Sequence, residues 1–229
     1  ENYESITKED VYFLIPEDLP KWALCSLDLM NIDANKIIKT KQSKAIICKN
    51  LISRRGHRCN SKISKHFDAI SPYDLKRLAN RLKNNINLNF KTPKRIFLSR
   101  NDAETRKILN QSEIEKFLNK FGFQTLMLNN IELSDQIVIF HNATHVISPH
   151  GAGLTNILFC KKKTSVLEIQ VKNHGIRPDF LQIASIMELN YYYECVASDN
   201  PLNNICIPLK TINKFLEITN CNYEKNLER

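Results

Sequence analysis

Glycine is scarce in this sequence, with five residues among 229, so Gly151 and Gly153, only one residue apart, are conspicuous. Long apolar runs are absent too. None approaches the roughly 20 residues that span a bilayer, and we expect no membrane span in this chain. The first residues, ENYESITKED, are acidic and polar, unlike a signal peptide. Because the first residue is not methionine, we expect a processed product or part of a longer protein, with any targeting segment outside this chain.

Paired cysteine motifs are also missing. The seven cysteines form no C-x-x-C pair and lack zinc-ligand spacing, which argues against a metal site. An odd, scattered set in a chain of this length is typical of reduced, structural thiols. We therefore expect a cytoplasmic protein, or one of the Golgi or ER lumen if a targeting segment has been removed.

Positive charge is in excess, with 33 Lys and Arg against 24 Asp and Glu and a net charge of +9. Such a balance favours an anionic partner: nucleic acid, anionic lipid or a phosphorylated small molecule. A soluble, lysine-rich surface explains the same balance, since the longest basic run is KKK at 161–163. Charge alone leaves both interpretations open. No RNA-binding aromatic motif is present, and we expect no nucleic-acid partner.

The first 90 residues carry a weak α/β pattern. Apolar spacing predicts strands at 11–15, 35–40 and 45–52 and a helix within 17–32. Residues 53–70 have no clean period and read as a loop. Ser71 as N-cap and Pro72 at the first helical position predict a helix to about residue 84. These elements are too few for a complete doubly wound domain, so we expect residues 1–90 to be a partial N-terminal lobe.

From residue 94 strands and helices alternate, which predicts an α/β fold with a Rossmann-like parallel sheet and helices on both faces. Ser112 and Glu115 have capping-box spacing, Gly122 suits the C-terminal end of that helix, and Ser134 suits the start of the next. Residues 91–229 are thus predicted to form a complete domain. The predicted strands are 95–99, 124–128, 145–148, 165–171 and 191–196, and the helices are 112–122, 134–143, 154–159, 177–189 and 208–219.

The stretch PHGAGLTN lies between a predicted strand and a predicted helix. In open parallel sheets ligands bind beyond the carboxyl ends of the strands, at such a junction. Gly151 and Gly153 would permit positive φ and close approach of a ligand to the backbone. The helix N-terminus would suit a phosphate, with Thr155 and Asn156 adding hydrogen bonds. The alternative is a tight strand-to-helix turn without a ligand.

Four further residues are candidates at the same edge. Arg100 follows a strand and Arg106 lies in the loop behind it, so both guanidiniums could grip a diphosphate; a solvated surface pair is the alternative. His150 could donate to a phosphate or serve as a structural hydrogen-bonding group. Glu168, near the end of an otherwise apolar strand, could hold ribose hydroxyls or face solvent in an edge strand.

These segments resemble glycosyltransferase family 61 over about residues 94–170, because several motifs agree in order. The segments are RIFLSRNDAETRKILNQSEIEKFLNKFGFQ, LSDQIVIFHNATHVISPHGAGLTNILF and VLEI. The matching residues are Ser99, Arg100, Arg106, Asn110, Glu113, Gly122, Phe123, Gln136 and His150 to Asn156.

The resemblance implies a GT-B-like enzyme with two Rossmann-like lobes that moves a sugar, with inversion, to a hydroxyl of a glycan or protein acceptor. The C-terminal lobe would hold the nucleotide-sugar donor, expected to be UDP-linked, and no cofactor or essential metal is expected. Arg100 and Arg106 would contact the diphosphate, and Glu168 would hold the ribose. The loop around phosphates and sugar would comprise His150, Gly151, Ala152, Gly153, Leu154, Thr155 and Asn156.

One departure concerns the N-terminal lobe, which lacks the Asn-Tyr-x-His-Trp-like segment of the family. The general base for the acceptor hydroxyl would belong to that lobe. Asp10, Glu17, His57 and His66 are conceivable bases, none is favoured, and the identity of the base stays open. His150, which could donate to a phosphate, is the catalytic candidate named on this chain. The alternative function is a non-catalytic, Rossmann-like module that binds a nucleotide or a polyanion.

Overall fold

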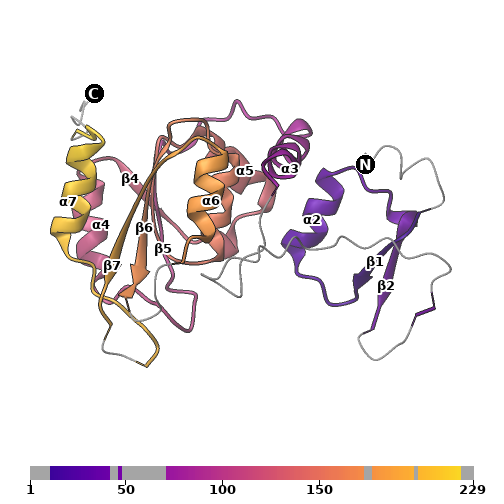
Figure 1. The fold of residues 1–229 in the computed structure, drawn as a ribbon, viewed down its shortest axis with the longest axis horizontal. Helices are drawn as coiled ribbons and strands as arrows, with labels where there is room; N and C mark the ends of the chain where they lie inside the picture. The colour runs from indigo at the N-terminus through magenta and orange to yellow at the C-terminus, as the bar shows by residue number, and fades with distance from the viewer. Residues whose placement is uncertain (1–10, 42–45, 48–70, 173–176, 199–200, 223–229) are drawn as a thin grey trace. The chain divides into compact units, whose positions relative to one another are not determined.

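The computed structural model describes residues 11–41, 46–47, 71–172, 177–198 and 201–222. Its internal contacts divide the chain into two units, Glu1–Ala69 and Ile70–Arg229. Figure 1 traces both units.

The first unit contains a parallel β-α-β arrangement. Strand β1 (Phe13–Pro16) pairs with strand β2 (Ile37–Thr40), with Phe13 opposite Ile37. Helix α2 (Lys21–Leu29) and the 3₁₀ turn η1 (Ala34–Lys36) connect the two strands. The strand predicted at 45–52 and the loop predicted at 53–70 lie largely outside the described residues.

The second unit has the α/β architecture predicted from the sequence. Its five strands are parallel and lie in the order β4-β3-β5-β6-β7. Figure 1 shows helices α4 and α7 on one face of the sheet and α5 and α6 on the other. The strands are β3 (Arg95–Leu98), β4 (Phe123–Leu126), β5 (His145–Pro149), β6 (Ser165–Val171) and β7 (Asn190–Val196), and the helices are α3 (Pro72–Asn84), α4 (Gln111–Asn119), α5 (Leu133–Asn142), α6 (Asp179–Ile186) and α7 (Leu209–Ile218), with 3₁₀ segments η2 (Leu128–Asn130) and η3 (Ala152–Phe159).

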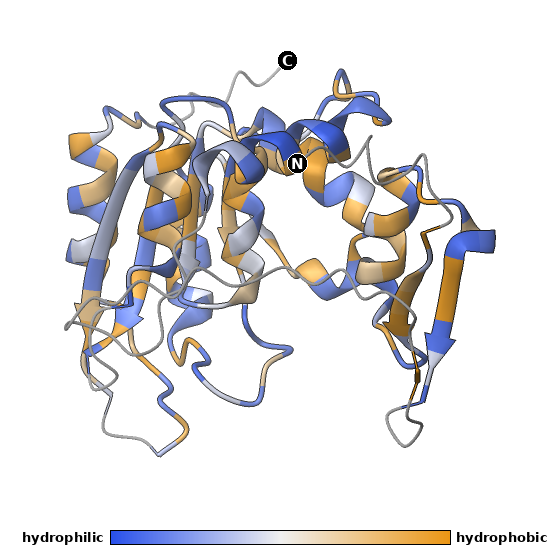
Figure 2. Ribbon diagram, turned by 45° about the vertical axis from the view of Figure 1, so that its right-hand side comes forward, coloured by the Kyte–Doolittle hydropathy of each residue, from blue (hydrophilic) through white to orange (hydrophobic). Residues whose placement is uncertain are grey.

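The core forms where apolar strands meet one face of each helix. Buried Phe97, Ile147 and Ile169 of the sheet belong to one cluster with Leu118 of α4 and Phe215 of α7. In Figure 2 the helices flanking the sheet carry both orange and blue residues, as expected for helices that bury one face. This packing holds the strand ends, and therefore the loops that follow them, in place.

The strand order creates a topological switch point. From β3 the chain runs outward to β4 and then returns to β5 on the other side of β3. The loops that leave the carboxyl ends of β3 and β5 therefore run in opposite directions, which opens a crevice between them. The two loops are those that carry Arg100 and His150.

Helix α3 belongs to the second unit, where it packs against η3 and α6. The sequence-based division near residue 90 placed this helix with the N-terminal part. Its predicted N-cap is confirmed, because the Ser71 hydroxyl accepts a hydrogen bond from the Asp74 N–H at 3.3 Å. The acceptor-side role of the N-terminal part stays a prediction.

The two helix N-caps predicted at Ser112 and Ser134 are wrong. Helix α4 starts at Gln111 with Asn110 as N-cap, so Ser112 lies inside the first turn and makes no capping box. Asn110 instead pairs through its side-chain amide with the backbone N–H and C=O of Ile207, both at 2.9 Å. Helix α5 likewise starts at Leu133, one residue before Ser134, because Glu132 already has the extended backbone of an N-cap. Gly122, predicted as the C-cap of α4, lies two residues beyond the observed C-cap Lys120 and has a left-handed φ of 69°.

Candidate functional site

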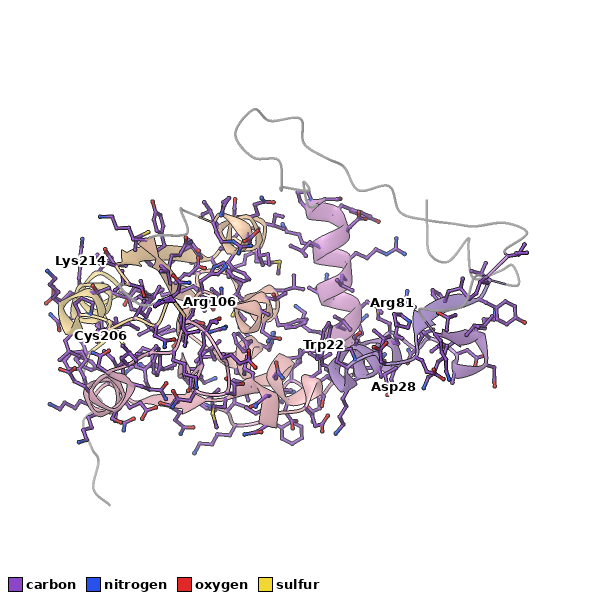
Figure 3. The ribbon with its side chains drawn as sticks, turned by 90° about the horizontal axis from the view of Figure 1, so that it is seen from below. Trp22, Asp28, Arg81, Arg106, Cys206 and Lys214 are labelled. Carbon is purple, nitrogen blue, oxygen red and sulfur yellow. The ribbon has the colours of Figure 1, made fainter. Side chains whose placement is uncertain are left out.

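The site candidates gather at the carboxyl edge of the sheet, beside the switch point. A cavity of about 330 Å³ lies there. Figure 3 views the molecule from the side on which the arrowheads of β6 and β7 lie in Figure 1, and it labels Arg106 there. The lining residues are Thr105, Arg106, His150, Gln170, Val171, Arg177 and Asn203.

The glycines of the loop after β5 do not have the predicted backbone. Gly151 has φ of 173°, an extended value open to any residue, and among the described glycines only Gly122 has a φ in the left-handed region. The prediction that Gly151 and Gly153 use a left-handed backbone is therefore wrong. A Cβ on Gly151 would lie 1.9 Å from Nη1 of Arg100, and one on Gly153 would lie 2.9 Å from Cδ1 of Leu128. The glycines make room for the protein's own side chains.

Arg100 is half-buried against this loop. Its Nη2 donates to the carbonyl of Thr105 at 3.5 Å, while its buried Nε has no hydrogen-bond partner within the described part of the chain. Burial lowers the pKa of Arg100, and repulsion by Arg106 lowers it further, against the opposing effect of Asp102. A buried guanidinium with an unused donor, next to a second guanidinium, is suited to bind an anion.

Arg106 is placed by backbone pairing rather than by a regular element. Its φ of 61° is rare for a residue with a side chain. The Arg106 N–H donates to the Leu202 carbonyl at 2.9 Å, and Ile108 bridges to Ile205 in parallel fashion. The segment between β7 and α7 therefore holds Arg106 in the loop after β3. Sequence spacing alone predicted that Arg106 lies in a loop, but not this partner segment.

His150 and Glu168 form a buried pair. Glu168 has 0% exposure and lies in the middle of β6, between β5 and β7, so the prediction of a strand-end position and the alternative of a solvent-facing edge residue are both wrong. Its Oε1 contacts Nδ1 of His150 within hydrogen-bonding range. The backbone N–H of His150 donates to the Ile169 carbonyl at 2.8 Å. The centroid of the His150 ring lies 5.1 Å from that of the Phe180 ring. These contacts fix the imidazole of a residue that lines the cavity.

Tyr191 and Gln170 complete this cluster and were missed from the sequence. The Tyr191 hydroxyl and Nε2 of Gln170 both donate to Oε2 of Glu168, the latter at 2.9 Å. Burial and the neighbouring carboxylate raise the pKa of Tyr191, which keeps its hydroxyl a donor. Gln170 also exchanges two 2.9 Å hydrogen bonds with the backbone of Arg177. The sequence held one signal for this cluster. Glu168 is an acid in an otherwise apolar strand, and the next strand along the chain is rich in tyrosine, which can donate to a buried carboxylate.

The rest of the glycine loop is held by hydrogen bonds to Gln136 of α5. The Asn156 amide donates to Oε1 of Gln136 at 2.9 Å and to the Gly153 carbonyl at 3.1 Å. Gln136 in turn donates to the carbonyls of Leu128 and Ile131. The amide predicted to contact a ligand is thus engaged within the loop. Of the other predicted residues, Leu154 is buried, while Ala152 and Thr155 are exposed.

The predicted general bases lie mostly outside the described residues. Among the general-base candidates, Asp10, His57 and His66 lie outside the described residues, and Glu17 is exposed beside Lys41 at 3.9 Å. The described part of the chain contains no group of three or more metal-ligating side chains and no helix suited to span a membrane. Among the described cysteines, Cys25, Cys160, Cys195 and Cys206 carry free thiols.

Comparison with known proteins adds independent information. The EGF domain-specific O-linked N-acetylglucosamine transferase of Bos taurus is 34% identical over 102 residues, which is 42% of this chain and 19% of the relative. The protein of the same name from Pan troglodytes is 38% identical over 80 residues, or 33% of this chain and 15% of the relative. The matched segment thus covers less than a fifth of either relative. The model of the family described as Glycosyltransferase 61 matches residues 13–167. The chain therefore belongs to the glycosyltransferase 61 family.

Proposed function

We propose that this chain belongs to an enzyme that transfers a sugar from a nucleoside-diphosphate-sugar to a hydroxyl group of a glycan or protein, and that the second unit binds the donor. Family membership supports the reaction class. The observation that carries the donor site is the gathering of Arg100, Arg106 and His150 at the switch point of the parallel sheet. Ligands of open α/β sheets bind at this place.

The size and charge of the cavity support a diphosphate. A volume of about 330 Å³ lies in the range of small-molecule sites. Arg106 and Arg177 line it, and Arg100 lies against the loop that His150 begins. No carboxylate lines this cavity among the described residues, since Glu168 is covered by His150. Guanidiniums bind phosphate oxygens bidentately, which suits two adjacent phosphates.

In the proposed reaction, a base removes the proton of the acceptor hydroxyl as its oxygen attacks the anomeric carbon. The bond from that carbon to the donor phosphate breaks, and the nucleoside diphosphate leaves with the electron pair, so the configuration inverts. Arg100 and Arg106 stabilise the charge that develops on the leaving diphosphate. The Ala152–Asn156 part of the loop borders the phosphates and the sugar. No step requires a metal ion.

The finer features remain part of the proposal. We propose a GT-B arrangement in the full-length protein, with the acceptor and the general base on the N-terminal side. A UDP-linked donor is proposed, and N-acetylglucosamine is the first sugar to test because the two relatives are named for its transfer. The cytoplasm is the proposed compartment, with the Golgi or ER lumen as the alternative.

Calorimetry with a panel of nucleoside diphosphates and their sugars tests the site. The wild-type chain should bind one base preferentially, and Arg100→Ala should weaken binding by about 100-fold, because charge-assisted hydrogen bonds to a phosphate are lost. Lys116→Ala removes the same charge from an exposed position on α4 and serves as the control. Undiminished binding by Arg100→Ala would show that the diphosphate lies elsewhere.

A second candidate function, polyanion binding, is favoured by a basic cavity at the opposite edge of the sheet. This cavity of about 300 Å³ is lined by residues that precede β5, β6 and β7, together with residues of α3. Burial lowers the pKa of Lys83, which lines this cavity together with His141. The charged lining residues are Lys76, Lys83, Lys161, Lys162 and Glu188.

The two functions differ in their response to salt. Binding of a single-stranded oligonucleotide by lysines would weaken steeply with salt concentration and would be reduced by the double variant Lys83→Ala and Lys161→Ala. The same variant should leave binding of a nucleoside diphosphate unchanged. Salt-insensitive or absent oligonucleotide binding would remove the second candidate.

A further inference from the structure

We propose that Glu168 acts in donor binding through His150, by holding the imidazole as a proton donor to the leaving diphosphate, and not by holding the ribose. The inference rests on the proposed function and concerns the same site. It assigns Glu168 as a positioning residue, with Tyr191 as its partner, and His150 as the group that touches the diphosphate.

The accessibility of Glu168 argues against direct contact with a ribose. Its side chain has 0% exposure and does not line the cavity, whereas His150 does. Both carboxylate oxygens are occupied, Oε1 by His150 and Oε2 by Tyr191 and Gln170. A ribose hydroxyl would have to displace a buried donor to reach either oxygen, which costs a hydrogen bond without a gain elsewhere.

The same contacts assign the ring nitrogens of His150. A carboxylate in an apolar strand requires hydrogen-bond donors, so the Nδ1 atom that faces Glu168 carries a proton. The Nε2 atom is then the ring nitrogen available to the cavity that His150 lines. It accepts a hydrogen bond in the neutral ring and donates one in the imidazolium.

Charged groups lie on several sides of the ring. Arg106 and Arg177 line the same cavity, and the carboxylate of Glu168 lies against Nδ1. Asp179 at the start of α6 is paired with Arg177 at 3.2 Å. Two further neighbours lie on the remaining sides, uncharged Phe180 against the ring and Tyr191 of β7 against the carboxylate.

A bound diphosphate presents only acceptor oxygens to the cavity, so its contact with Nε2 requires a proton on that nitrogen. Glu168, against the opposite nitrogen, supplies the negative charge that balances a ring protonated at both positions. Glu168→Gln removes this charge and should weaken any ligand that offers a diphosphate, whatever its base or sugar. Tyr191→Phe removes a donor from the carboxylate and leaves the negative charge facing His150 in place.

Calorimetry of the full chain with inorganic pyrophosphate and with a nucleoside diphosphate, at one constant pH, tests this assignment. Glu168→Gln should weaken both ligands by the same factor, about tenfold at neutral pH. Tyr191→Phe should leave the ratio of the two affinities unchanged. His150→Gln should also weaken both ligands, and adding Glu168→Gln to that variant should then change affinity little.

Each contrary result has a distinct meaning. If Glu168→Gln weakens the nucleoside diphosphate but leaves pyrophosphate unchanged, Glu168 holds the ribose and the inference is wrong, while the proposed function stands. If the wild-type chain binds neither ligand, the proposed function fails instead. Should Glu168→Gln not fold, Tyr191→Phe decides, because weaker binding of the nucleoside diphosphate alone, with pyrophosphate unchanged, contradicts the assignment.

Discussion

The two edges of the parallel sheet each carry a basic cavity of similar size, and they are built differently. At the carboxyl edge, arginines approach a glycine loop, and a buried carboxylate supports a histidine. At the amino edge, lysines surround the exposed carboxylate of Glu188, which pairs with Lys162 at 2.8 Å and with Lys76 at 3.6 Å. The difference teaches that positive charge alone does not make a site. Groups held by buried partners are oriented before a ligand arrives, whereas exposed lysines are not.

The largest expected effect is the difference in stability between variants of Glu168 at the carboxyl edge and of Glu188 at the amino edge. Glu168→Ala should lower the free energy of unfolding by about 3–5 kcal/mol, because His150, Tyr191 and Gln170 lose a buried common acceptor. Glu188→Ala should leave the midpoint of urea unfolding unchanged, since its ion pairs are exposed to solvent. Equal destabilisation by the two variants would contradict the distinction between the edges.

The second effect sharpens the account of the glycine loop. Gly151→Ala should weaken nucleoside diphosphate binding by at least about tenfold, because the new methyl group would displace the guanidinium of Arg100. Gly153→Ala should change binding much less, since its contact is the flexible end of Leu128. Calorimetry on both variants, with circular dichroism as a folding control, measures the difference. A larger loss in Gly153→Ala would mean that the loop, and not Arg100, requires glycine.

A third effect concerns the response of the amino edge to pH. Burial lowers the pKa of both His141 and His145, with Lys161 and Arg95 respectively adding repulsion. The unfolded chain therefore binds more protons at these sites than the folded chain, so stability is retained above about pH 6.5 and falls as pH decreases below it. Thermal unfolding between about pH 7 and pH 5 should show this decrease, and His145→Gln should reduce it. A pH-independent melting temperature in the wild-type chain would refute the expectation.

The smallest effect is the salt sensitivity of the Glu188 pairs. Neighbouring Lys162 and Lys76 lower the pKa of Glu188 at the protein surface. Raising the salt concentration should screen this attraction and leave the melting temperature almost unchanged. The pKa of Glu188, followed by NMR, should rise toward its ordinary value as salt is added. A salt-independent pKa would indicate that the hydrogen bond to Lys162, and not the charge, sets it.

Local sequence pattern was sufficient for the elements but not for their boundaries. Apolar periodicity predicted strands β3 to β7 and helices between them, because each element must bury an apolar face. The segment between β5 and β6 is the exception, because it forms the 3₁₀ segment η3 and not an α-helix. The N-caps predicted at Ser112 and Ser134 were wrong, because the helices begin earlier, with Asn110 and Glu132 as their N-caps. Asn110 has a more distant partner, Ile207, and a contact 97 residues away leaves no local signal.

By itself the sequence determined the α/β class, the family and the edge of the sheet at which Arg100, Arg106 and His150 gather, because alternating elements leave few ways to arrange a parallel sheet. Only the tertiary structure decided why Gly151 has no side chain and what Glu168 touches. Both answers depend on side chains from strands that are distant in sequence and adjacent in the sheet. Periodicity reports which residues are buried, while the partners of a buried charge follow from strand order and register.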